Sequence, residues 1–196
     1  MTGRLAPLLA ALLVASAAQA ADCPDGKTAG KGFVLERPGV TSIFRPSPEH
    51  VVQITNSFDS SPPQTQFLLG GLIEVFRTSE TGQFATLPDS DMRGIFPLKE
   101  GASEKVEWLH LDAGENAVDP RSLELQVTGK ETLKLGACEY KVLAVKQIFR
   151  AADGSEIDAY TALYAPELEA VLAKRYDEGT GKEETIDYRS IKPLVE

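Results

Sequence analysis

Apolar and polar residues alternate with a period of two over most of the chain. Leu123, Leu125 and Val127 alternate with polar residues, so all three side chains point to one face of an extended strand. The same alternation starts at Cys138 and gives way to an apolar run near residue 143. This is typical of a strand that becomes buried on both faces. The pattern predicts a β-sheet.

Turn residues separate these segments. Asp153-Gly154 has the chemistry of a hairpin turn and predicts a second strand over residues 157–163. Gly129-Lys130 is interpreted as another turn. Gly70-Gly71 interrupts the apolar run 67–77 and predicts a bulge or bend where a twisted sheet turns a corner.

The remaining segments favour strands over helices. Short β-branched or aromatic runs lie between Pro, Gly, Ser and Asp clusters, at residues 33–35, 43–45, 51–55, 67–77 and 106–111. Residues 166–176 have helical spacing behind Pro166, but they also fit a strand. We favour a turn at Pro166-Glu167 followed by a strand. The expected fold is all-β and mainly antiparallel, as a curved sheet, half-barrel or sandwich, with little helix apart from a signal peptide.

The first twenty residues have the three parts of a secretory signal peptide. Arg4 supplies the positive start, residues 8–15 form an apolar stretch, and Ala18-Gln19-Ala20 precedes a cleavage site near Ala20. We therefore expect a periplasmic or secreted protein in which residues 21–196 form a single domain.

No membrane anchor is expected in the remaining chain. The apolar stretch 67–76 contains two glycines and Glu74, and it is shorter than the roughly 20 residues that span a bilayer. Asp22 precedes Cys23 where lipid attachment needs a small residue. The sequence therefore predicts neither a transmembrane segment nor a lipid anchor.

Composition and charge argue against several classes of function. The 196 residues are 42% hydrophobic and 25% charged, and the formal net charge is −9, which is typical of a globular protein and unfavourable for binding nucleic acid. The chain has two Cys and two His, which excludes multi-cysteine zinc scaffolds and three-histidine metal sites. It has neither a Gly-x-Ser-x-Gly nor a Gly-x-Gly-x-x-Gly motif. No cofactor, metal or nucleic-acid partner is expected.

The two cysteines are expected to form a disulfide. An exported chain meets an oxidising environment, in which Cys23 and Cys138 would most simply pair. There is no Cys-x-x-Cys motif that would favour a redox function. The pair would fasten the N-terminal arm to the sheet.

Aromatic residues indicate where a ligand could bind. Trp108 and His110 share one face of a predicted strand, and Tyr160 and Tyr164 share another with Ala162 between them. A small residue between two aromatic rings can leave a shallow groove, and rings with a polar tip suit contacts with sugars, peptides or proteins. The alternative is that these side chains only pack in the core and at its rim.

Acidic residues supply the candidates for catalysis. Two carboxylates from loops could hydrolyse an envelope polymer, and the candidates are Asp89, Asp91, Asp112 and Glu115. Asp89 and Asp91 could also hold calcium, but the spacing lacks the other ligands of a calcium loop, which favours a solvated loop. No residue is assigned a catalytic role.

Several short segments follow one another in a fixed order in the second half of the chain, namely residues 96–101 (FPLKEG), Trp108, 127–132 (VTGKET), 135–140 (LGACEY) and 164–168 (YAPEL). Through this ordered set, residues 95–192 resemble a group of secreted or periplasmic, β-rich bacterial proteins of unknown function. Leu163 replaces a tryptophan of that pattern, and Cys138 lies in its small-residue turn, which is consistent with a subgroup that added a disulfide. The resemblance implies architecture and compartment, and it implies no catalytic residue.

These observations favour a non-catalytic periplasmic protein that binds an envelope component, either a lipid, a glycan or a protein. The alternatives are the carboxylate-dependent envelope hydrolase and a passive assembly or stability factor. The candidate binding residues are Trp108, His110, Tyr160 and Tyr164. The sequence does not predict an oligomeric state.

Overall fold

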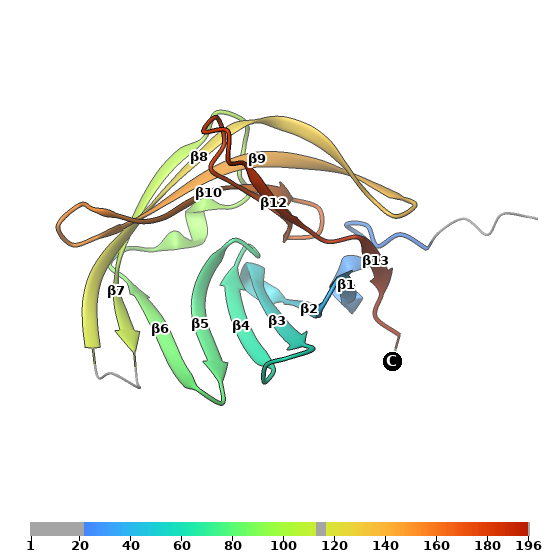
Figure 1. Cartoon of the computed structure of the whole chain (residues 1–196), viewed down its shortest axis with the longest axis horizontal. Helices are drawn as coiled ribbons and strands as arrows, with labels where there is room; N and C mark the ends of the chain where they lie inside the picture. Colours follow the sequence, from blue (N-terminus) through green and yellow to red (C-terminus); the bar gives the residue numbers. More distant parts are fainter. Residues whose placement is uncertain (1–21, 113–116, 196) are drawn as a thin grey trace, which may run out of the picture.

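The computed structural model describes residues 22–112 and 117–195 and has one antiparallel sheet of thirteen strands (Figure 1). The strands are β1 (Phe33–Arg37), β2 (Val40–Ser47), β3 (Val51–Phe58), β4 (Gln64–Leu69), β5 (Ile73–Ser79), β6 (Gly82–Pro88), β7 (Ser103–Asp112), β8 (Ala117–Leu135), β9 (Cys138–Ala151), β10 (Glu156–Ala165), β11 (Ala170–Tyr176), β12 (Glu184–Asp187) and β13 (Ser190–Pro193). The predicted signal peptide, residues 1–20, lies outside the described residues.

Helical structure in the described residues is confined to three short 3₁₀ turns. These are η1 (Ala29–Lys31), η2 (Pro48–His50) and η3 (Met92–Ile95). The described part of the chain has no helix with the length and apolar character needed to cross a membrane. The prediction of an all-β, antiparallel fold is confirmed, and the sheet is open and curved.

The strands follow one another across the sheet in sequence order. Each strand from β1 to β12 pairs with its neighbours in the chain, and β13 returns to pair with β1. Figure 1 shows that the sheet curls until β8 to β12 lie above β1 to β5. The curled sheet therefore packs its two halves against each other.

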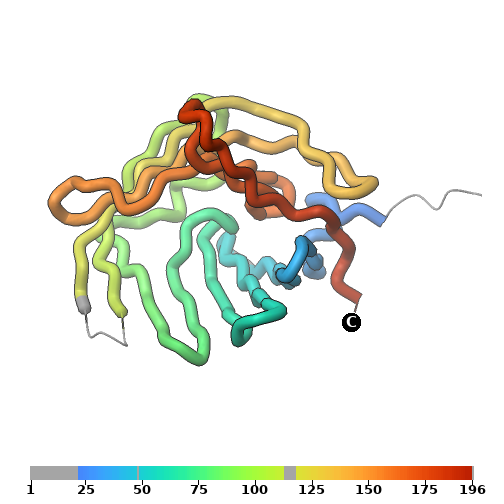
Figure 2. The backbone as a smooth tube through the Cα atoms, in the orientation of Figure 1, coloured from blue at the N-terminus to red at the C-terminus, as the bar shows by residue number. Residues whose placement is uncertain are grey.

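The C-terminal segment joins the two edges of the curled sheet (Figure 2). β12 pairs with β11, whereas β13 pairs with β1 at the other edge. The link between them is hydrogen-bonded to both sides, because Tyr188 N donates to Leu172 O at 3.2 Å and Arg189 N donates to Glu36 O at 2.8 Å. Residues 184–193 thus hold the curl in place.

Two hydrophobic clusters fill the interior. The first joins β1 to β3 with β9 to β11, and it includes the stacked rings of Phe33 and Phe44, whose centroids are 4.8 Å apart. The second lies under β7 to β10 and receives Leu72 from the β4–β5 turn and Phe96 from the residue after η3. Burial of such apolar surface is the main stabilising term of the fold. Because Phe96 is part of the second cluster, the segment between β6 and β7 covers this cluster.

Two of the predicted turns are confirmed. Asp153-Gly154 closes the β9–β10 hairpin, where Ala151 N donates to Ser155 O at 2.9 Å. Residues 166–169 form a turn and β11 follows it, so the strand interpretation of 166–176 is confirmed.

Two other predictions at glycines differ from the structure. Gly129-Lys130 is not a turn, because β8 continues through it to Leu135, with a bulge against β9 in which Thr128, next to the glycine, is the extra residue. The chain turns at Gly136 instead, where φ is +59°. Gly70-Gly71 makes the reversal between β4 and β5 instead of a bend in one long strand.

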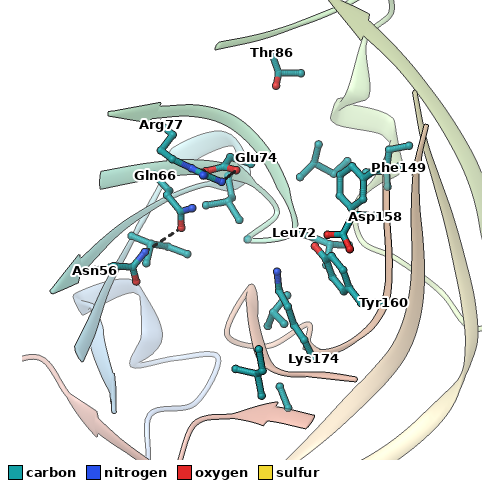
Figure 3. Close-up of a pocket in the computed structure, with 18 of the residues that line it drawn as sticks. Asn56, Gln66, Leu72, Glu74, Arg77, Thr86, Phe149, Asp158, Tyr160 and Lys174 are labelled. Carbon is teal, nitrogen blue, oxygen red and sulfur yellow. Dashed lines mark hydrogen bonds and ion pairs between the residues drawn. The ribbon is translucent and has the colours of Figure 1, made fainter. Parts of the chain in front are cut away.

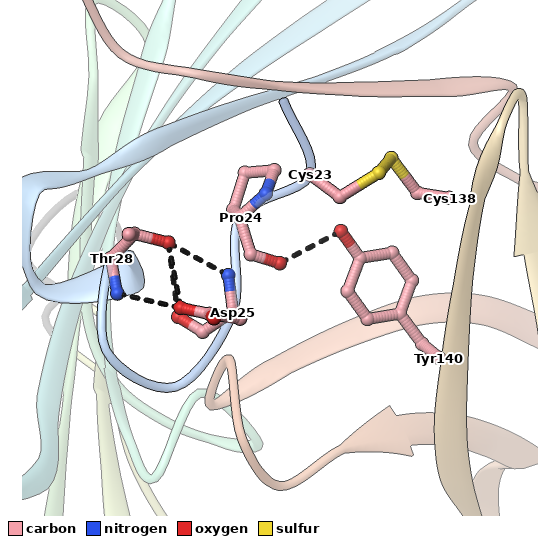
Figure 4. Close-up of a disulfide and its surroundings, with 6 residues drawn as sticks. All are labelled: Cys23, Pro24, Asp25, Thr28, Cys138 and Tyr140. Carbon is pink, nitrogen blue, oxygen red and sulfur yellow. Dashed lines mark hydrogen bonds between the residues drawn. A yellow bond between two sulfur atoms is a disulfide. The ribbon is translucent and has the colours of Figure 1, made fainter. Parts of the chain in front are cut away.

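The N-terminal arm is fastened to the head of β9 (Figure 4). The sulfur atoms of Cys23 and Cys138 are 2.01 Å apart, at bonding distance, and the Cα atoms are 5.7 Å apart. Tyr140 OH donates to Pro24 O at 2.9 Å. Asp25 then closes a turn by accepting from Thr28 N at 2.9 Å. These contacts position η1 beside β2.

Candidate functional site

A cavity of about 640 Å³ lies on the concave side of the sheet (Figure 3). Every strand from β1 to β12 contributes at least one side chain to its lining, so the cavity is a direct result of the curl. Its volume lies within the range of about 300–1,000 Å³ that small-molecule sites occupy.

A row of aromatic rings forms one wall of the cavity. The ring of Trp108 meets Phe149 edge-on with centroids 6.4 Å apart, and Phe149 lies 5.9 Å from Tyr160, which lies 5.4 Å from Tyr176. Trp108 is 7% exposed, and its Nε1 has no hydrogen-bond partner among the described residues. This wall offers flat apolar surface, and the indole N–H within it is a buried donor without a partner among the described residues.

The opposite wall carries an ion pair, and a β-bulge determines where this pair lies. Leu68 of β4 pairs with Glu74 and Phe67 pairs with Phe76, so Val75 is the extra residue of a bulge in β5. Residues three apart on a regular strand point to opposite faces, but the bulge brings Glu74 and Arg77 to the cavity side, and both line it. Arg77 Nε donates to Glu74 Oε1 at 2.7 Å.

The guanidinium of Arg77 also packs on an aromatic ring. Its Cζ lies 4.5 Å from the centroid of the Phe84 ring, and that ring lies 4.9 Å from the ring of His110. Arg77 is therefore held by a carboxylate and a ring at the same time. It is a fixed part of the wall.

Lys174 extends into the cavity from β11 (Figure 3). Its Nζ lies 4.1 Å from the centroid of the Tyr160 ring, and among the described residues no carboxylate oxygen lies within 4.0 Å of it. Burial lowers the pKa of Lys174 below its usual value, and the charges of Asp158 and Glu74 oppose this shift. The cavity thus contains a cation that is partly removed from water.

Side-chain hydrogen bonds close the cavity beside β2 to β4. Ser42 Oγ donates to Asn56 Oδ1 at 2.6 Å, and Asn56 Nδ2 donates to Gln66 Oε1 at 3.1 Å. Ser42 Oγ also lies 2.8 Å from Tyr188 OH of the C-terminal segment. The side chains of Ser42 and Asn56 and the hydroxyl of Tyr188 at this end thus have partners inside the protein.

The structure brings three of the four predicted binding residues to the cavity. Trp108, His110 and Tyr160 line it. Tyr164 is 2% exposed and packs in the second hydrophobic cluster. Ala162 is fully buried, so the groove expected between Tyr160 and Tyr164 is not open; Ala162 faces the packed core instead of solvent.

His110 and Tyr160 have pKa values that are shifted by their surroundings. Burial lowers the pKa of His110, and the charge of Arg121 lowers it further. Burial raises the pKa of the Tyr160 hydroxyl, which donates to Gln147 Oε1 at 3.4 Å. Both side chains are therefore uncharged in the neutral range.

Sequence reasoning missed four charged lining residues, namely Lys174, Glu74, Arg77 and Asp158. A lysine in an alternating strand usually faces solvent, and the bulge that turns Glu74 inward leaves no mark in the residue pattern. Which side chains of β11 face the cavity could be predicted only from the pairing of β11 with β10. Strand pairing across the whole sheet is needed to find these residues.

The predicted acidic residues are not assembled into one site. Asp91 accepts from Arg93 Nε at 3.0 Å and from Arg93 Nη2 at 2.8 Å, which holds the pKa of Asp91 at about 2. Asp89 follows the end of β6 that pairs with Trp108, whereas Asp112 pairs with the other end of β6. Glu115 lies outside the described residues. No group of three His, Cys, Asp or Glu side chains in the described chain could hold a metal ion.

No protein-family model and no curated protein matches the sequence. Among solved structures, the fold is similar to that of the hypothetical lipoprotein YmcC from Escherichia coli (K12), with a TM-score of 0.51 and 12% sequence identity. The similarity covers 83% of this chain and 85% of that chain. At this identity the likeness concerns the fold: the curled antiparallel sheet of this chain is an architecture that it shares with that lipoprotein.

Proposed function

We propose that this chain is a non-catalytic binding protein of the bacterial cell envelope that holds a lipid-like ligand in its concave cavity. The observation that carries the proposal is the cavity itself, about 640 Å³ in volume and lined along one side by the rings of Trp108, Phe149 and Tyr160. An apolar ligand would gain roughly 0.8 kcal/mol for each methylene that it buries there.

The nature of the lining favours a lipid over the two other envelope ligands. Aliphatic side chains such as Leu68, Leu72 and Val171 line the cavity beside the rings. A glycan would need many hydrogen-bonding groups, but Ser42, Asn56 and Gln66 are bonded to one another. A protein partner would need a broad surface instead of a concave one.

Three observations support an envelope location. The first is the signal peptide expected at residues 1–20, and the second is the Cys23–Cys138 pair at bonding distance, since such pairs persist in oxidising compartments. The third is the fold likeness to a lipoprotein. The resemblance to secreted β-rich bacterial proteins agrees with the same location.

The side chains of the cavity favour binding over catalysis. Glu74 is engaged by Arg77, and the ring of His110 packs beside Phe84. A general acid or base needs a group that is free to reach the proton it transfers. These groups are instead built into the wall.

Binding of an uncharged apolar dye tests the proposal. We expect N-phenyl-1-naphthylamine to bind the purified protein saturably, with one site and enhanced dye fluorescence. Val171→Trp should fill the cavity and abolish binding, whereas Leu109→Trp, at a position 43% exposed and outside the lining, should not. Circular dichroism shows whether each variant keeps its β-sheet.

Two results would overturn the proposal. One is the absence of saturable dye binding, and the other is unchanged binding by a folded Val171→Trp variant. Solvent extraction of protein purified from a native envelope, followed by mass spectrometry, gives an independent answer. A lipid-like molecule should be recovered in stoichiometric amount, and recovery of an oligosaccharide would assign the cavity to a glycan.

A further inference from the structure

We infer that the ligand carries an anionic head group and that Lys174 binds it. The inference rests on the proposed function and names the ligand class: an alkyl chain that ends in a carboxylate, phosphate or sulfate. The alkyl chain would lie along the aromatic wall, and the head group would meet the amino group that extends from β11.

The first step is the charge balance of the cavity. Four cationic side chains line it against three carboxylates, although the whole chain has a formal net charge of −9. The cations are Arg37, Arg77, Arg121 and Lys174, and the carboxylates are those of Glu74, Asp158 and Asp187. The cavity therefore differs from the rest of the protein in the sign of its charge.

The second step is that most cations around the cavity already have partners. Arg77 is paired with Glu74 at 2.5 Å, and Arg121 lies 3.5 Å from Asp119. On β11 itself, Arg175 is paired with Glu131 at 2.6 Å. Lys174, its neighbour in the strand, has no ion pair within 4.0 Å in the described chain.

The third step concerns how Lys174 is held. Its cross-strand partner on β10 is Ala162, a small residue, and the amino group lies over the Tyr160 ring. Asp158 and Glu74 attract it from a greater distance. A cation in such a place is costly without a close counter-ion, and a bound anion would supply one.

Trp108 provides a second, independent indication of a polar ligand atom. Its Nε1 is buried in the same lining and has no partner among the described residues. A buried donor that is left unpaired costs about 1–3 kcal/mol, so such groups usually have a partner in the functional state. An oxygen atom of a ligand that displaces the side chains covering this nitrogen would satisfy it.

The experiment compares three probes that share a twelve-carbon chain. Dodecanoate and dodecyl phosphate carry an anionic head group, and dodecan-1-ol does not. The fluorescence of Trp108, the only tryptophan of the chain, reports binding to the cavity wall. We expect both anions to bind at least about tenfold more tightly than the alcohol, as a charge-assisted hydrogen bond provides, and the tighter of them identifies the head group.

Variants assign this preference to Lys174. Lys174→Met should reduce it to less than about twofold while the affinity for dodecan-1-ol stays the same, and Lys174→Arg should keep it. Lys146→Met is the matched control, because Lys146 is an exposed strand lysine outside the lining. It should behave as the wild type.

The outcomes separate this inference from the proposed function. If all three probes bind equally, the anion inference is wrong and the proposed function stands. If none binds and the neutral dye does not bind either, the proposed function fails. If Arg37→Gln removes the preference and Lys174→Met does not, the head group lies at the Arg37 end of the cavity and the role given to Lys174 is wrong.

Discussion

Lys174 illustrates how one residue can serve binding at the expense of stability. Its amino group lies over the Tyr160 ring in a partly buried cavity and has no close carboxylate among the described residues. A charge in such a position destabilises the ligand-free fold. Residues that are unfavourable for folding are often found at functional sites.

The pH dependence of stability should reveal this cost. The folded protein holds the pKa of Lys174 below its usual value, so the unfolded chain binds the proton more strongly. The destabilisation is complete below the folded pKa and disappears once the pH exceeds the unfolded value near 10.4. We expect Lys174→Met to gain more free energy of unfolding relative to wild type at pH 7 than at pH 10.

Urea denaturation of both proteins at the two pH values measures this difference. Other titrating groups, including the buried tyrosines, are common to both proteins, so their contributions cancel in the comparison. Lys146→Met should show no such change, because Lys146 is exposed. A difference between Lys174→Met and wild type that is constant or larger at pH 10 would contradict the account of Lys174.

At the scale of elements, the turn between β4 and β5 fixes the position of the cavity wall. A Cβ on Gly71, which has φ +67°, would lie 1.6 Å from Glu169 O in the turn between β10 and β11. Glu169 also contacts His50 of η2, and the carbonyl oxygen of His50 accepts a hydrogen bond from Gly70 N at 2.6 Å. Only glycine allows the two halves of the sheet to approach this closely.

Gly71→Ala should therefore destabilise the protein by about 3 kcal/mol or more, since both the backbone conformation and the contact with Glu169 become unfavourable. For a chain of this size we expect the melting temperature to fall by roughly 6–12 °C. Gly82→Ala is the control, because nothing lies within 4 Å of a Cβ at that position. Similar melting temperatures for the two variants would show that the contact between the turns can relax.

The period-two pattern was sufficient to predict individual strands, because alternation reports which side chains are buried. It identified the strand around Leu123 and the hairpin at Asp153-Gly154. The pattern wrongly predicted a turn at Gly129, because a glycine beside a bulge and a glycine in a turn can have the same local sequence. The β-bulge depends on the partner strand β9, which the local pattern does not contain.

The candidate site was predictable only in its aromatic part. Trp108 and His110 are in phase on one strand and both line the cavity with Tyr160, whereas Tyr164, which is in phase with Tyr160, packs in the core. Lys174 and Glu74 reach the cavity through the pairing of β11 with β10 and the bulge in β5. Such positions depend on contacts between distant segments, and a single sequence carries little information on those contacts.

At the scale of the whole molecule, the curl depends on the C-terminal segment that joins both edges of the sheet. Besides its backbone bonds, this segment contributes Tyr188 OH, which lies 2.8 Å from Ser42 Oγ on β2. Ser42 is fully buried. The contact between these two hydroxyl groups therefore links the C-terminal segment to β2.

Tyr188→Phe should lower the free energy of unfolding by about 1 kcal/mol, the usual net value of one hydrogen bond, and the melting temperature by roughly 2–4 °C. Tyr176→Phe is the matched control, since its hydroxyl has no hydrogen bond to any described residue. Equal losses in the two variants would mean that the contact with Ser42 does not stabilise the closure.

The cysteine pair closes a long loop, because it joins residues 115 positions apart. Closing so long a loop restricts the unfolded chain, so replacing both cysteines by serine should lower the free energy of unfolding by about 2–4 kcal/mol. The far-UV circular dichroism signal of the sheet should remain, since the strand ladders do not depend on the arm. Wild-type protein kept in reductant should melt like the double variant. An unchanged melting temperature, or loss of the β signal, would contradict a role limited to fastening the N-terminal arm.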